Sequence, residues 1–185
     1  MAATPSNMLP LGTKAPDFTL FDTITNRNCS LDDLKSEIAT VIMFICNHCP
    51  YVKHINRELV RVVNEFMPKG VQFIGINSND VVNYPEDSPE NMRKNAKQQG
   101  YSFPYLFDET QEVAKAYQAA CTPDFYIFDK ELKLVYRGQF DDSRPGNTIK
   151  TDGMDIRIAL DNIIAGMPVD TLQKPGIGCN IKWKY

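Results

Sequence analysis

The sequence has 185 residues, a formal net charge of -3 and 43% hydrophobic residues, a composition typical of a soluble globular protein. This weak charge provides no broad basic surface for nucleic acid, and no apolar run approaches the roughly 18 residues that a membrane-spanning helix needs. We therefore expect neither a nucleic-acid partner nor a membrane partner. The length predicts one domain over residues 1–185, with a core at about 12–165 and a C-terminal tail at 167–185.

Five cysteines are too few for a disulfide scaffold, and their odd number leaves at least one unpaired within a monomer. The N-terminus, from Met1 to Thr13, has no Lys or Arg and no sustained apolar stretch, so both parts of a secretory signal are missing. Both observations favour a reducing compartment. We expect the protein to be cytoplasmic.

An apolar run and an amphipathic segment form the centre of the expected fold. Residues 40–45 are apolar after the first, which is typical of a strand buried on both faces, and residues 50–66 change to helical periodicity. A second apolar run at 71–76 makes this a right-handed parallel strand-helix-strand crossover. The other expected elements are strands at 12–21 and 26–30, a short helix after Ser30, helices at 88–99 and 110–119, a strand at 104–107, a hairpin at 125–128 and 132–136, and a helix at 156–164.

Two cysteines separated by two residues, Cys46 and Cys49, lie where the first apolar strand ends and the amphipathic helix begins. Pro50 fits the first turn of that helix, which places the cysteines at its N-terminus. Unpaired backbone N–H groups and the positive end of the helix dipole favour a thiolate there. We expect Cys46 to attack a disulfide and Cys49 to resolve the mixed disulfide, while a protonated His48 adds local positive charge. This chemistry requires no metal and no organic cofactor.

Six short motifs together resemble the AhpC/TSA and TlpA/ResA-like branch of the thioredoxin superfamily. They are Ala15-Pro16-Asp17-Phe18, the dithiol, Gly75-Ile76-Asn77, Phe103 to Asp108, Thr122-Pro123 and Asp129-Lys130. The resemblance implies an α/β thioredoxin-like fold, with a central mixed β-sheet flanked by helices and an N-terminal β-hairpin extension. It also implies a cis peptide bond before Pro123, held against the dithiol, with the Thr122 backbone free to pair with a substrate strand. His48 is similar to the histidine of oxidising disulfide-exchange motifs, so it should make the couple more oxidising.

These features favour a thiol-disulfide oxidoreductase that acts on protein or small-thiol disulfides, with an electron donor that the sequence does not identify. The sequence does not indicate an oligomeric state either. A peroxiredoxin-like thiol peroxidase is the alternative, because peroxiredoxins also place proline directly after their reactive cysteine, as in Cys49-Pro50. Their threonine and upstream proline are replaced here by Cys46 and Ile42, and their later arginine is missing near Thr122. We therefore favour disulfide exchange over peroxide turnover.

A zinc- or copper-binding module is a further alternative. A structural zinc site needs four ligands, but no second cysteine pair accompanies the dithiol. The other possible donors are His48, His54, Cys29, Cys121 and Cys179. Cys29 is interpreted as a structural thiol. Cys121, next to Pro123, could be a third thiol or a resolving partner of the dithiol, but inert packing is favoured. Cys179 follows glycines in a segment able to move, where a disordered tail thiol is favoured over a second redox thiol.

Overall fold

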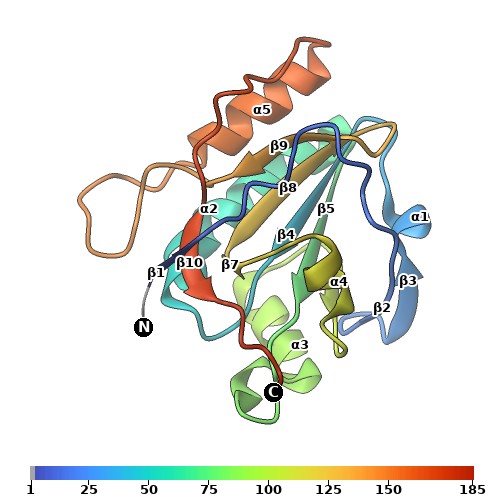
Figure 1. The fold of residues 1–185 in the computed structure, drawn as a ribbon, viewed down its shortest axis with the longest axis vertical. Coiled ribbons are helices and arrows are strands. Elements are labelled where there is room, and N and C mark those ends of the chain that lie inside the picture. Colours follow the sequence, from blue (N-terminus) through green and yellow to red (C-terminus); the bar gives the residue numbers. More distant parts are fainter. Residues whose placement is uncertain (1–2) are drawn as a thin grey trace.

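The computed structural model describes residues 3–185 and is built around a seven-stranded sheet (Figure 1). The strands lie in the order β3 (Arg27–Ser30), β2 (Thr19–Asp22), β6 (Tyr105–Phe107), β5 (Val71–Asn77), β4 (Ala39–Phe44), β8 (Asp124–Asp129) and β9 (Leu134–Gly138). Strands β4, β5 and β6 are parallel, whereas β8 runs antiparallel to β4. This mixed sheet with flanking helices confirms the α/β fold that the motifs imply.

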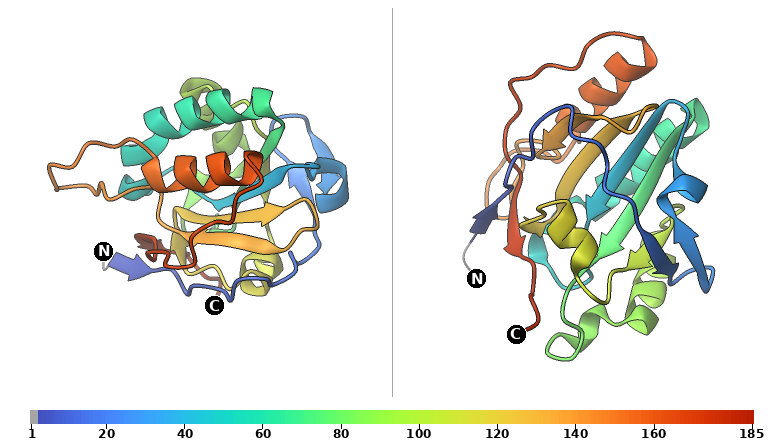
Figure 2. Two further views of the ribbon diagram at one scale, coloured as in Figure 1. Left: turned by 90° about the horizontal axis from the view of Figure 1, so that it is seen from above. Right: turned by 45° about the vertical axis from the view of Figure 1, so that its right-hand side comes forward.

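Helices cover both faces of the sheet (Figure 2). They are α1 (Leu31–Leu34), α2 (Pro50–Phe66), α3 (Pro89–Gln99), α4 (Glu112–Ala116) and α5 (Met154–Ile164), with short 3-10 turns η1 (Met67–Lys69) and η2 (Pro85–Asp87). In β4, Val41 and Met43 join the hydrophobic cluster formed with α2, α3 and α5, whereas Ile42 and Phe44 join the cluster that contains α4. Both faces of β4 are buried, which explains its uninterrupted apolar sequence. No helix in the described residues is long and apolar enough to cross a membrane.

Helix α2 begins at Pro50, and Cys49 is its N-cap residue. Proline is tolerated in the first turn because the N–H that it lacks would have no partner within the helix. The buried stripe of α2 includes Val52, Ile55, Leu59, Val62, Val63 and Phe66. Because this stripe packs in one cluster with β4 and β5, it fixes the start of the helix, and with it Cys49, at the carboxyl edge of the parallel strands.

The predicted N-terminal hairpin is present, although its first strand is shorter than expected. Strand β2 pairs antiparallel with both β3 and β6, so the hairpin extends one edge of the sheet. Gly12 lies outside β2 because its N–H bonds instead to the Leu134 carbonyl at 2.8 Å. Ser30 caps α1 as predicted, and its hydroxyl accepts a hydrogen bond from the Asp33 amide at 3.1 Å.

A second sheet, which the sequence pattern does not predict, joins the two ends of the chain. It has three antiparallel strands in the order β1 (Ala3–Pro5), β10 (Ile177–Asn180) and β7 (Cys121–Thr122). Figure 1 shows β10, in red, alongside β1 and next to β7. The expectation of a disordered tail at Cys179 is wrong, because this residue pairs with Thr122 and is only 3% exposed.

The carboxyl group of Asp124, at the start of β8, is enclosed beneath this second sheet. It is fully buried and accepts hydrogen bonds from Ser6 Oγ at 2.8 Å and from the Tyr126 hydroxyl at 3.1 Å. Burial raises the pKa of Asp124 to about 6. Because an aspartate in an unfolded chain has a pKa of about 3.9, the folded state binds this proton more tightly. Asp124 therefore lowers stability as the pH rises between these two values.

We predict that Asp124→Asn removes this pH dependence. As the pH rises from ~4 to ~7, wild type loses stability and the variant does not. The difference between their free energies of unfolding should therefore shift in favour of the variant by on the order of 2–3 kcal/mol. Urea unfolding of both proteins at a series of pH values measures the difference. A difference that stays constant across this range would contradict the assignment.

Candidate active site

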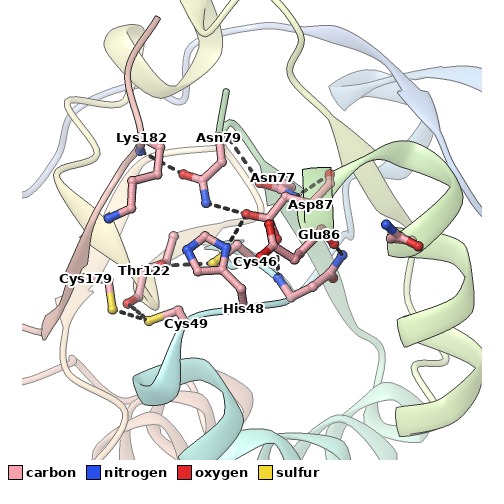
Figure 3. A network of polar contacts seen from close by, with 12 residues as sticks. Cys46, His48, Cys49, Asn77, Asn79, Glu86, Asp87, Thr122, Cys179 and Lys182 are labelled. Carbon is pink, nitrogen blue, oxygen red and sulfur yellow. Dashed lines mark hydrogen bonds and ion pairs between the residues drawn. The ribbon is translucent and has the colours of Figure 1, made fainter. Parts of the chain in front are cut away.

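The dithiol lies at the carboxyl edge of the sheet, between β4 and α2 (Figure 3). Cys46 follows the end of β4, and Cys49 caps α2. The structure places these residues and His48 beside the loop that contains Pro123, so it brings together all the site residues that the sequence predicts. Both cysteine side chains are buried, at 1% and 0% exposure.

Thr122, the residue before Pro123, contacts both sulfur atoms. The Cys49 sulfur lies 3.2 Å from the Thr122 carbonyl oxygen, and the Cys46 sulfur lies 3.4 Å from Thr122 Oγ1. The peptide bond between Thr122 and Pro123 is cis, as the resemblance implies. The expectation of a free Thr122 backbone is wrong, because the chain's own strand β10 pairs with it through Cys179.

Cys179 places a third sulfur in the site. Its Sγ lies 2.8 Å from Cys49 Sγ, which is longer than the roughly 2.05 Å of a disulfide bond, and all five cysteines are free thiols. Cys121 is buried nearby on β7, but its sulfur faces the Pro123 carbonyl oxygen at 3.7 Å. Cys29 lies on β3, at the far edge of the larger sheet. The sulfur cluster therefore consists of Cys46, Cys49 and Cys179.

A buried carboxylate holds the loop between the two dithiol cysteines. Asp87 is 0% exposed, accepts a hydrogen bond from the Asn47 backbone N–H at 2.7 Å, and lies 2.7 Å from His48 Nδ1. The Asn79 side-chain amide donates to the same carboxylate at 2.7 Å, and its oxygen accepts from the Lys182 backbone N–H at 2.9 Å. Figure 3 shows this network extending from the dithiol loop to the C-terminal segment.

His48 is partly buried, and its ring stacks on Tyr84 with the centroids 5.6 Å apart. The hydrogen bond to Asp87 raises the pKa of His48, while burial opposes this shift. The environment therefore favours the protonated ring. The positive charge that His48 is expected to add beside the dithiol stays a prediction.

The two dithiol sulfurs have opposite pKa shifts. The hydrogen bond with the Cys46 thiol, supported by Cys179 and Thr122, lowers the pKa of Cys49 to about 5 although burial opposes the shift. The pKa of Cys46 is raised, first because its thiol is hydrogen-bonded to Cys49 and then because it is buried. These shifts favour Cys49 over Cys46 as the thiolate, whereas the sequence predicts that Cys46 is the attacking thiol. Proximity to a helix N-terminus does not indicate which of the two thiols donates to the other.

Asp87 and Asn79 are site residues that the cysteine motif does not predict. A signal for Asn79 exists, because the polar run from Asn77 to Asp80 directly follows the apolar part of β5. The parallel strands β4 and β5 end at the same edge of the sheet, so polar groups after one strand reach the dithiol after the other. Asp87 gives no such signal, since it lies in η2 beyond the turn that follows this run.

Three possible metal donors lie together in the site. In the part of the chain that the structure describes, ligand atoms of Cys46, His48 and Asp87 lie within 4.8 Å of one another. His54 does not join them, because its Nε2 lies 3.1 Å from Ser143 Oγ. A closed structural zinc site needs four ligands, whereas the sulfur cluster needs no further group for thiol exchange. The geometry thus gives more support to redox chemistry than to a metal site.

A dithiol at a helix N-terminus, beside a cis-proline loop on a mixed sheet, defines a thioredoxin-like protein with a thiol-based redox site. The chain belongs to the AhpC/TSA family, whose model matches residues 11–137. No curated protein matches the sequence significantly.

Solved structures agree with this placement. An uncharacterized conserved protein from Geobacillus kaustophilus is 65% identical, with a TM-score of 0.98 over 100% of this chain and 97% of that one. The thioredoxin domain of a thiol-disulfide oxidoreductase from Bacteroides vulgatus is 21% identical, with a TM-score of 0.60 over 70% and 88%. Peroxidoxin BcpB from Mycobacterium tuberculosis is 19% identical, with a TM-score of 0.62 over 84% and 96%. The last two share the fold, and the family supports a thiol redox role.

We predict that Asp87→Asn lowers the pKa of His48 toward the ordinary value of about 6.5, because the hydrogen bond that raises it is weakened. The His48–Asp87 pair stabilises the fold fully below that ordinary value and loses its contribution as the pH rises through the raised pKa. The variant should therefore lose more stability at pH ~5 than at pH ~8. NMR titration of the His48 ring gives the pKa directly.

Glu86→Gln is the matched control, because it removes the adjacent carboxylate and leaves Asp87 in place. It should leave the pKa of His48 unchanged. An unchanged pKa in Asp87→Asn would contradict the role of this contact.

The thiolate assignment makes a spectroscopic prediction. The reduced protein should gain thiolate absorbance near ~240 nm with a midpoint at about pH 5. Cys49→Ala should lose this step, whereas Cys46→Ala should keep it at a higher pH, because the hydrogen bond that lowers the Cys49 pKa is gone. The opposite pattern would make Cys46 the thiolate.

Proposed function

We propose that the protein is a thiol-disulfide oxidoreductase with Cys46 and Cys49 as its redox dithiol. The observation that carries this proposal is geometric: Cys46 and Cys49 lie at the start of α2, and both sulfurs contact Thr122, the residue before the cis Pro123. The lowered pKa of Cys49 and the raised pKa of Cys46 are consistent with one thiolate beside one protonated thiol. Only the thiolate is an effective nucleophile in disulfide exchange, and a neighbouring thiol completes the reaction. No organic cofactor takes part in this chemistry.

In the proposed reaction, the Cys49 thiolate attacks a substrate disulfide, forms a mixed disulfide with one half and releases the other half as a thiolate. Cys46 then attacks the Cys49 sulfur, which forms the Cys46–Cys49 disulfide and releases the second half. Cys46 must lose its proton in this step. The Asp87 carboxylate is placed to accept it, since one of its oxygens lies within 4.8 Å of the Cys46 sulfur.

The substrates that fit this chemistry are protein or small-molecule disulfides, and a thiol donor must restore the reduced pair. The odd and small number of cysteines, five, favours action in a reducing compartment such as the cytoplasm. Strand β10 covers the Thr122 backbone, so a substrate strand that pairs there must first displace it. Small-molecule disulfides do not pair with the Thr122 backbone, so their reaction does not require the displacement of β10.

Peroxide reduction is the second candidate, and one observation favours it. Cys49 combines a lowered pKa with the N-cap position directly before Pro50, which suits a peroxide-attacking thiolate. Against it, the hydrogen-bond partners of the two dithiol sulfurs in residues 3–185 are Thr122 and Cys179, and none is an arginine. In the described residues, no arginine therefore bonds to either sulfur, which weakens the case for peroxide activation.

One paired assay separates the two functions. We predict that the wild-type protein catalyses dithiol-driven reduction of insulin, and that Cys46→Ser and Cys49→Ser each lose at least ~100-fold of that rate, because exchange needs both sulfurs. Peroxide consumption is measured on the same three proteins, and far-UV circular dichroism checks that each variant is folded. Peroxide turnover that survives in Cys46→Ser, with no insulin reduction by wild type, would select the peroxidase instead. Stoichiometric zinc or copper after purification under reducing conditions would favour the metal-binding module.

A further inference from the structure

The backbone of strand β7 lies beside the dithiol, and strand β10 pairs with it. Cys179 of β10 pairs with Thr122 of β7 in antiparallel register. This pairing aims the Cys179 side chain at the redox site, where its sulfur lies 2.8 Å from the Cys49 sulfur. A strand of the chain itself thus presents a thiol to the thiolate that the proposed reaction uses.

The close approach of β10 depends on a residue without a side chain. A Cβ atom at Gly178 would collide with the Thr122 carbonyl group and would lie 3.1 Å from the Pro123 nitrogen. Glycine is therefore required next to Cys179 for the strand to reach β7. The Gly-Cys pair has a physical role in bringing the third sulfur into the site.

The segment after β10 is firmly attached to the rest of the fold. The Ile181 N–H bonds to the Ala120 carbonyl at 3.2 Å, and the Lys182 carbonyl accepts from the Asp80 N–H and from Gln111 Nε2, each at 2.8 Å. The side chain of Trp183 packs against a hydrophobic cluster. These contacts anchor the chain on the C-terminal side of Cys179 and help to hold its sulfur in place.

We propose that Cys179 is a third redox cysteine, which forms an intramolecular disulfide with Cys49 during exchange. The inference rests on the proposed function and assigns a further residue to the same reaction. Among the five cysteines, this role falls to Cys179 because the Cys121 sulfur faces the Pro123 carbonyl and Cys29 lies on β3.

The chemistry balances with a small-molecule disulfide RSSR as the oxidant. The Cys49 thiolate attacks RSSR, which forms Cys49–S–S–R and releases RS⁻. The released RS⁻ takes the Cys179 proton, and the Cys179 thiolate attacks the Cys49 sulfur, which forms the Cys49–Cys179 disulfide and releases the second RS⁻. Finally, Cys46 attacks Cys49, forms the Cys46–Cys49 disulfide and returns the thiol to Cys179. Overall, two thiols lose two electrons, and RSSR becomes two thiols.

The decisive experiment traps the intermediate. The Cys46→Ser variant removes the competing thiol, and the reduced variant is treated with glutathione disulfide, quenched with an alkylating reagent and digested for mass spectrometry. We expect the Cys49 and Cys179 peptides to be joined in most of the oxidised protein. The double variant Cys46→Ser/Cys179→Ser should instead accumulate glutathione on Cys49. Cys46→Ser/Cys121→Ser is the matched control and should retain the Cys49–Cys179 bond.

A second variant tests the geometry without removing a sulfur. Gly178→Ala in the Cys46→Ser background should sharply lower the yield of the Cys49–Cys179 disulfide, because β10 is displaced from β7. Gly166→Ala is the control for backbone strain away from β10: its φ of +68° strains an alanine locally, but nothing lies within 4 Å of the added Cβ. An undiminished yield in Gly178→Ala would overturn the proposed dependence on β10.

The outcomes distinguish this inference from the proposed function. If wild type forms the Cys46–Cys49 disulfide but Cys46→Ser keeps glutathione on Cys49 with Cys179 free, the role of Cys179 is overturned and the oxidoreductase stands. If neither wild type nor Cys46→Ser forms any bond at Cys49, the proposed function itself fails.

Discussion

The arrangement of the site depends on the hydrogen bonds that one buried carboxylate, that of Asp87, must make. Asp87 is fully buried, and a carboxylate in such a place is costly unless it is hydrogen-bonded. Its partners come from three separate segments: the loop between the cysteines, the end of β5 and, through Asn79, the C-terminal segment at Lys182. The hydrogen bonds of this one group therefore tie the dithiol loop to the end of β5 and to the C-terminal segment.

The sulfur cluster illustrates how burial and reactivity coexist. Burial alone disfavours a thiolate, and it does raise the pKa of Cys179 to about 12. Cys49 differs, because hydrogen bonds with the neighbouring thiols of Cys46 and Cys179 lower its pKa to about 5. The pKa values of the three thiols are thus graded, with that of Cys49 lowered and those of Cys46 and Cys179 raised.

The central layers could be predicted from the sequence because local pattern and burial agree there. The apolar residues of β4 are buried on both faces, the periodicity of α2 matches its buried stripe, and Ser30 caps the helix that follows it. Cys46, Cys49, His48 and Pro123 follow from motif and order along the chain. These are all features that neighbouring residues determine.

The parts that escaped prediction depend on distant partners. Strand β10 is four residues long and contains Gly178, so its sequence has no strand pattern, and its pairing is decided by the edges of β1 and β7. Asp87 is one acid among many until η2 brings it to the dithiol loop. Which of Cys46 and Cys49 keeps its proton depends on side-chain positions, and the spacing of the two cysteines in the sequence does not determine these.

The placement of β10 between β7 and β1 also bears on how copies of the protein meet. An open strand edge is a template for pairing with another chain, and here such an edge would lie beside a reactive thiolate. Strand β10 fills it, and the sheet then ends at β1, which has three residues and closes with Pro5, a residue without a backbone donor. The arrangement therefore discourages edge-to-edge aggregation and disulfide-linked dimers at the position where both would otherwise begin.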